Sequence, residues 1–165
     1  MSETNKNLQE AFAGESQANR KYLAFAKQAE ADGYMQAARL FRAAAMAETV
    51  HALSHLKALG GIKSTAENLK AALEGETHEF KSMYPGMIEK AKAEGKKDAE
   101  RSFSYANEVE KIHAGLYAKA LEALKAGAAE VDYYVCDVCG NTVEGSAPDK
   151  CSVCGAGKKA FKKAE

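Results

Sequence analysis

The sequence predicts an all-α four-helix bundle followed by a small metal-binding β module. Two observations carry this prediction. Alanine, glutamate, lysine and leucine dominate residues 4–126, where apolar positions recur every three or four residues, as in helices with one buried face. After Tyr133 the composition changes to cysteine, glycine and short β-prone runs, and all four cysteines lie between residues 136 and 154.

We expect four long helices, over about residues 4–32, 34–59, 66–94 and 96–126. Glycines after the first three segments are typical helix ends. Ser64 and Glu67 have the spacing of a capping box at the start of the third helix. Pro85-Gly86 should kink this helix or interrupt its hydrogen bonds. Residues 60–75 form either a short hairpin or a long crossover, and the periodicity leaves both possibilities open.

Charge and composition exclude several classes of protein. Acidic and basic residues balance at 23 each, so no basic excess indicates nucleic-acid binding. The N-terminus, MSETNKNLQE, lacks the layout of a signal peptide, and no run approaches the ~20 apolar residues of a membrane span. We therefore expect a soluble, cytoplasmic protein, in which clustered cysteines favour metal binding over disulfides.

An internal repeat is the most informative feature of the helices. AETVHALSHLKAL (47–59) aligns with VEKIHAGLYAKAL (109–121), and GESQANRKYLAFA (14–26) aligns with GETHEFKSMYPGM (75–87). Each helical hairpin then has one Glu on its first helix and Glu-x-x-His on its second. The aligned positions are Glu15, Glu48 and His51 in one hairpin, and Glu76, Glu110 and His113 in the other.

These residues form a recognisable ligand set. Glu and His at positions i and i+3 share a helix face, here the apolar face, where a carboxylate is costly unless it is compensated. Four carboxylates and two imidazoles projecting into a bundle are the ligands of ferritin-like di-iron and di-manganese proteins. Four carboxylates also neutralise two divalent ions. Iron or manganese suits this set, and zinc also fits by ligand type.

Glu79 breaks the repeat, because its counterpart in the first helix is Ala18. It lies three residues after Glu76, on the same face. A fifth carboxylate is unnecessary for two divalent ions but helps to balance two trivalent ones. We therefore interpret Glu79 as a ligand in one oxidation state only; the alternative is an ordinary surface residue.

Four other polar side chains lie near these positions. Tyr22 and Tyr84 follow the apolar stripes and are either core residues or hydrogen-bonding partners of the ligands. His55 forms H-x-x-x-H with His51, a zinc-binding spacing, but it aligns with Tyr117 and falls outside the repeat. We interpret it as a supporting or structural residue. His78 should be exposed.

The C-terminal segment contains two C-x-x-C-G knuckles. Their ligands are Cys136, Cys139, Cys151 and Cys154, and four thiolates in this arrangement form a tetrahedral site for zinc or iron. The spacing does not distinguish a structural zinc ribbon from a redox-active iron site. With so few apolar residues, the module should fold only around its metal.

Together these motifs closely resemble rubrerythrin over nearly the whole chain. The resemblance rests on GESQAN, ETVH, GETHEF with MYP, EKIH, and CDVCG with CSVCG. It implies a ferritin-like di-iron bundle over residues 1–128 and a rubredoxin-like domain with one iron over residues 129–165. It also implies that the residues matching His51 and Glu79 are alternative ligands of one iron. Ser152 stands where rubredoxin knuckles commonly have proline.

The resemblance further implies a peroxide reductase of oxidative-stress defence. Hydrogen peroxide would be reduced to water with electrons from NAD(P)H, supplied by separate redox proteins through the four-cysteine iron. A ferroxidase or iron-handling protein that uses dioxygen is the alternative, although storage has no need of a one-electron carrier. A zinc-binding structural protein is a further alternative, which leaves Glu79 unexplained.

The length of the last helix leads to one geometric expectation. About 20 Å of helix separates His113 from its end, at 1.5 Å per residue. A module tethered there should lie far from its own di-iron site and deliver electrons to a second subunit. We therefore expect a homodimer or a larger homo-oligomer.

Overall fold

The computed structural model describes residues 2–127 and 129–165. It divides into two compact units, Met1–Lys63 and Ser64–Glu165. The predicted boundary between the bundle and the C-terminal module, at residue 128, lies outside the described residues. In the part of the chain that the structure describes, no helix is both long enough and apolar enough to cross a membrane.

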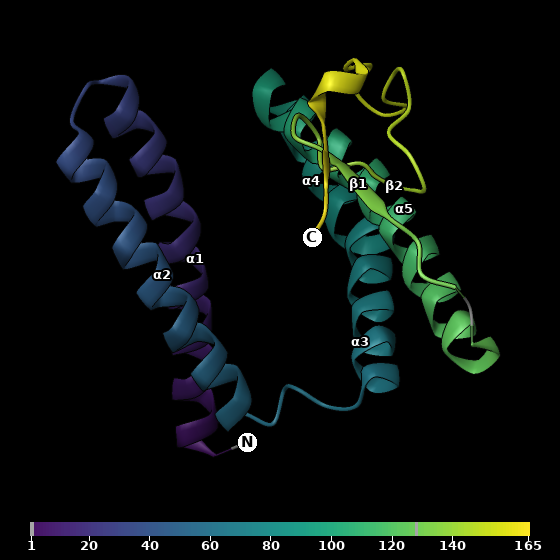
Figure 1. Ribbon diagram of the computed structural model, residues 1–165, viewed down its shortest axis with the longest axis horizontal. Coiled ribbons are helices and arrows are strands. Elements are labelled where there is room, and N and C mark those ends of the chain that lie inside the picture. The colour runs from purple at the N-terminus through teal and green to yellow at the C-terminus, as the bar shows by residue number, and fades with distance from the viewer. Residues whose placement is uncertain (1, 128) are drawn as a thin grey trace. The chain divides into compact units, whose positions relative to one another are not determined.

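The first unit is a hairpin of two long helices, α1 (Glu3–Ala31) and α2 (Met35–Ala58), which lie side by side in Figure 1. Ser2 caps α1 by accepting a hydrogen bond from the backbone N–H of Asn5. The buried residues of the pair are all alanines: Ala26, Ala29, Ala38, Ala45 and Ala52. Small side chains on both helices allow the two backbones to approach closely.

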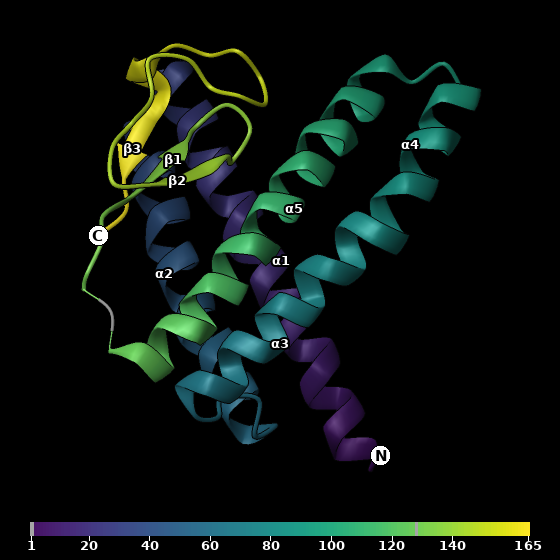
Figure 2. The ribbon, with the colours of Figure 1, turned by 90° about the vertical axis from the view of Figure 1, so that its right-hand side faces the viewer.

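The helices of the second unit are α3 (Thr65–His78), the π-helical turn η1 (Glu79–Met83), α4 (Tyr84–Ala93) and α5 (Lys97–Ala126). The first three follow one another as one helical rod beside α5 (Figure 2). The predicted capping box is present, with Ser64 and Glu67 each accepting from the backbone N–H of the other.

The π turn lies immediately before Pro85, where the sequence predicts an interruption. Proline lacks an N–H group, so Pro85 cannot donate the helical hydrogen bond to the carbonyl of Lys81, four residues earlier. The backbone N–H of Tyr84 correspondingly donates to the carbonyl of Glu79, five residues back. The helix therefore continues past Pro85 with a shifted hydrogen-bond register, and the predicted interruption is confirmed in this form.

The C-terminal module is a three-stranded antiparallel sheet with strand order β2-β1-β3. The strands are β1 (Tyr133–Cys136), β2 (Thr142–Glu144) and β3 (Phe161–Lys163), with a 3₁₀ turn, η2 (Lys158–Ala160), before the last. Cys136, Cys151 and Phe161 form its small core. Gly127 ends α5 in the left-handed conformation, with φ of 66°, and the module contacts α5 through β2.

This contact contradicts the expectation that the module lies about one helix length from its own metal-binding residues. Thr142 of β2 lies within hydrogen-bond distance of His113 in the same chain. The module was expected at the C-terminal end of α5, where the chain leaves the helix. The described strands instead run back along α5.

Candidate metal centres

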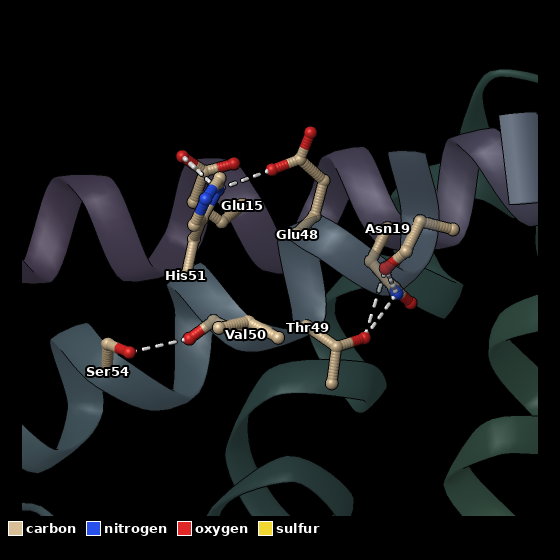
Figure 3. Close-up of polar contacts among 8 residues, drawn as sticks. Glu15, Asn19, Glu48, Thr49, Val50, His51 and Ser54 are labelled. Carbon is tan, nitrogen blue, oxygen red and sulfur yellow. Dashed lines mark hydrogen bonds and ion pairs between the residues drawn. The ribbon is translucent and has the colours of Figure 1, made fainter. Parts of the chain in front are cut away.

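The first hairpin brings together Glu15 from α1 with Glu48 and His51 from α2. Glu48 Oε2 lies 2.9 Å from His51 Nδ1, and Glu15 Oε1 lies 3.9 Å from the same nitrogen. Each of the three side chains offers one ligand atom, and these atoms all lie within 4.8 Å of one another. In Figure 3 dashed lines join the imidazole to both carboxylates. We call these residues the first triad.

A polar brace holds α1 and α2 in register beside the first triad. Asn19, one turn after Glu15, donates from Nδ2 to the carbonyl of Ala45 at 2.7 Å and to Thr49 Oγ1 at 2.9 Å (Figure 3). Thr49 directly follows Glu48. The brace therefore fixes the relative height of the two helices at the point where their carboxylates meet.

A hydrogen bond between the two carboxyl groups of the first triad shifts their pKa values in opposite directions. The hydrogen bond with Glu48 raises the pKa of Glu15, with burial and the charge of Glu48 acting in the same direction. The same hydrogen bond, followed by that with His51, lowers the pKa of Glu48. A bound cation would compensate the same carboxylate charge.

The second triad consists of Glu76 from α3 with Glu110 and His113 from α5. Glu110 Oε2 lies 2.8 Å from His113 Nδ1, and Glu76 Oε1 lies 3.7 Å from it. The three ligand atoms again lie within 4.8 Å of one another. The two triads therefore share one local geometry, as the internal repeat predicts.

The second triad is more buried than the first, and its carboxylates hold protons more strongly. Burial, followed by the hydrogen bond and the charge of Glu110, raises the pKa of Glu76 to about 7. Burial also raises the pKa of Glu110. Two carboxylates and an imidazole at this separation match the donor set of a hard divalent cation, which would compensate the charge that protons neutralise here.

The remaining predicted residues lie outside the two triads. Glu79 is half-buried at the start of η1 and lies outside the second triad, although its charge raises the pKa of both Glu110 and Tyr84. Burial is the main cause of the raised pKa of Tyr84. Tyr22 packs against Phe25 and Phe41.

Both histidines outside the repeat lie where the sequence places them. His55 is half-buried near the first triad, and its charge lowers the pKa of Glu15. His78 is exposed.

The four cysteines converge at one point of the C-terminal module. Cys136 Sγ lies 3.7 Å from Cys154 Sγ, Cys139 Sγ lies 3.6 Å from Cys151 Sγ, and no disulfide joins them. Four sulfurs within 4.8 Å of one another fit a tetrahedral metal site. Burial raises the pKa of Cys139.

Cys151 differs from Cys139 in the number of hydrogen bonds that it receives, because Cys139 has one such bond, from the backbone of Asn141. Burial alone would raise its pKa, but bonds from the backbone of Cys154, the amide of Asn141 and the backbone of Val153 lower it to about 6. Asn141 is 1% exposed and donates from Nδ2 to Cys151 Sγ at 3.4 Å. Hydrogen bonds of this kind stabilise thiolate and tune the potential of a bound iron.

Sequence reasoning missed four polar residues that support these sites. They are Asn19, Thr49, Asn141 and Thr142. Asn19 does lie four residues after Glu15, on the same helix face, which is a usable signal. Asn141 and Thr142 act across contacts that helical periodicity cannot reveal.

Two family descriptions match the chain along its length. Residues 6–121 match the family model described as Rubrerythrin, and residues 134–162 match that of the rubrerythrin rubredoxin-like domain. The chain belongs to the rubrerythrin family. The resemblance inferred from the motifs is thereby confirmed, as is the fold class: a ferritin-like four-helix class with a C-terminal rubredoxin-like module.

Individual relatives of this rubrerythrin-family chain are similar over most of their length. Rubrerythrin-2 of Clostridium acetobutylicum is 36% identical, with 93% of this chain and 92% of the relative covered. Nigerythrin of Nitratidesulfovibrio vulgaris is 37% identical, with 96% and 85% covered. The structure of fully reduced, all-ferrous nigerythrin aligns with a TM-score of 0.60 at 33% identity, covering 99% of this chain and 88% of the other.

Family membership and the donor groups together establish the cofactors. The chain is an oxidoreductase-type iron protein with a di-iron carboxylate/histidine site and a rubredoxin-like four-cysteine iron site. The donor chemistry agrees, since carboxylates with imidazoles suit iron, and four thiolates suit a single tetrahedral iron.

Proposed function

We propose that this protein is a non-haem di-iron peroxidase that reduces hydrogen peroxide to water in oxidative-stress defence. The balance is H₂O₂ + 2 H⁺ + 2 e⁻ → 2 H₂O. The electrons come ultimately from NAD(P)H through separate redox proteins and enter at the four-cysteine iron. We further propose that it works in the cytoplasm as a homodimer or larger homo-oligomer, independently of nucleic acid and membranes.

The ligand assignment is part of the proposal. Glu15, Glu48, His51, Glu76, Glu110 and His113 would hold the di-iron site, and Glu79 would join it in one oxidation state. Cys136, Cys139, Cys151 and Cys154 would hold the single iron. When bound, the two ferrous ions supply the pair of electrons that cleavage of the O–O bond requires.

One observation carries the choice of a redox function. The four-cysteine module, a one-electron carrier when it binds iron, contacts the second triad through Thr142 and His113. A storage protein has no use for such a carrier beside its metal ligands. The contact therefore favours repeated reduction of the di-iron site over deposition of iron.

The protein also offers a route of access and a source of protons. A cavity of about 370 Å³ reaches the second triad, lined by His113, Tyr117 and Thr142 among others, and is large enough for peroxide. Glu76 holds a proton up to about pH 7 when no cation is present. Tyr84 has a raised pKa and therefore keeps its hydroxyl proton beside the carboxylates.

Anaerobic stopped-flow mixing tests this function. The fully reduced, iron-loaded protein is mixed with peroxide and, separately, with dioxygen, while absorbance follows oxidation of each iron site. We expect much faster oxidation by peroxide. Equal or faster oxidation by dioxygen would overturn the proposal in favour of a ferroxidase, and no response from either site would indicate a zinc scaffold. Turnover with NADH or NADPH and a separate reductase then tests the electron source.

A further inference from the structure

The two histidines of the repeat differ in the partner of their second ring nitrogen. Both place Nδ1 beside the glutamate three residues earlier, at 2.9 Å for His51 and 2.8 Å for His113. His113 Nε2 also lies 2.8 Å from Thr142 Oγ1, the first residue of β2. Among the described residues of the first unit, no hydrogen-bond partner occupies the corresponding position beside His51.

The direction of the His113 contact follows from the second bond of the threonine. Thr142 Oγ1 donates its only hydrogen to the carbonyl of Gly140, at 3.1 Å. With its hydrogen on this carbonyl, Thr142 Oγ1 accepts from His113, and the imidazole then carries a hydrogen on Nε2. The lone pair of Nδ1 is then available on the side that faces Glu76 and Glu110.

We propose that Thr142 is a positioning residue that makes His113 a fixed metal ligand. It holds the ring in the tautomer and orientation that present Nδ1 to the cation, a restraint that no described residue of the first unit gives to His51. This inference rests on the assignment of His113 as a ligand in the proposed function, but it does not depend on peroxide as the substrate.

The same contact links the two metal centres of the second unit. Thr142 directly follows Asn141, which donates to Cys151 Sγ, and Gly140 directly follows Cys139. The loop that wraps the four-cysteine site thus also supplies the partner of His113. Formation of the small iron site and orientation of a di-iron ligand depend on one short segment, residues 139–142.

The test uses the full-length protein loaded with zinc at both sites, because zinc is diamagnetic and accepts imidazole, carboxylate and thiolate ligands. Thr142→Val removes the hydroxyl while keeping the shape, and Thr142→Ser keeps the hydroxyl. The exposed Thr65→Val is the matched control. Two quantities are measured: solvent exchange of the His113 Nε2–H by ¹⁵N NMR, and the rate at which a chelator removes zinc from the carboxylate/histidine site.

We expect Thr142→Val to lose protection of the Nε2–H and to release that zinc about 10- to 100-fold faster, the usual effect of removing a hydrogen-bond partner of a ligand. Thr142→Ser and Thr65→Val should behave like the unmodified protein, and the four-cysteine zinc should be retained throughout. Wild-type exchange and release in Thr142→Val would overturn the proposal. So would losses in Thr142→Ser as large as those in Thr142→Val, since the serine variant keeps the hydroxyl that the proposal makes responsible. Neither measurement involves peroxide, so failure of the proposed function leaves this result unaffected.

Discussion

Asn19 Nδ2 and the carbonyl oxygen of Ala45 lie 2.7 Å apart, joining α1 to α2 one turn from the first triad. A side-chain amide can reach a helix backbone only where the facing residue is small. Ala45 is 1% exposed and supplies that small surface. Close approach of the two helices therefore sets the separation of Glu15 and Glu48.

Ala45→Leu should destabilise the hairpin by about 1–3 kcal/mol, because the added side chain overpacks a closely approached pair of helices. Urea denaturation measures the change. Ala47→Leu, two residues away on an exposed position of the same helix, is the control and should have little effect. Equal losses in the two variants would show that helix propensity, rather than packing, decides the result.

Without metal in the carboxylate/histidine site, the free energy of unfolding of the protein should fall as the pH rises from about 5 to about 7. The pKa of Glu76 is about 7 in the folded state but near the ordinary glutamate value of 4.5 when the chain is unfolded, so the folded state binds the extra proton across this interval. Urea denaturation at several pH values measures the slope, with the four-cysteine metal retained.

Glu76→Gln should flatten this pH dependence, because the amide does not titrate. Glu89→Gln, an exposed position on α4, should preserve it. A slope that persists unchanged in Glu76→Gln would mean that other groups, such as Glu110, dominate the linkage.

Glu79→Gln should leave ferrous binding intact and weaken retention of ferric iron. If Glu79 balances the charge of the oxidised pair, its removal should speed iron loss to a chelator on the order of 10-fold after oxidation, with little change before it. Colorimetric iron release from reduced and oxidised protein makes the comparison, with Glu89→Gln as the control. An identical effect in both oxidation states would argue against a redox-dependent role.

Removal of the four-cysteine metal should unfold the C-terminal module selectively. Its fully buried apolar residues are Cys136, Cys151 and Phe161, and the hydrophobic residues packed against them are only partly buried, so the apolar core is too small to hold a three-stranded sheet without a metal. Hydrogen exchange should lose protection over residues 133–163, while α3 and α5 remain protected. Cys151→Ser should reproduce the effect. Retained protection of β1 in metal-depleted protein would contradict this dependence.

Local patterns in the sequence predict the helices, both triads and the cysteine cluster. Helix limits follow from glycines and the Ser64–Glu67 capping box, and each triad follows from i, i+3 spacing together with the repeat. The position of the module does not follow, because it depends on a chain reversal after α5 and on one contact between Thr142 and His113. Such a contact joins residues 29 positions apart and leaves no periodic signal.

The π turn at Glu79–Met83 has a consequence for how the two hairpins are related. Seven positions separate Glu15 from Tyr22, but eight separate Glu76 from Tyr84. The spacing between the paired glutamates changes equally, from 33 positions to 34. These counts match a duplicated hairpin in which one copy gained a single residue, accommodated as a wider helical turn. The one-residue difference between the two hairpins coincides with the π turn, and Glu79 is the first residue of that turn.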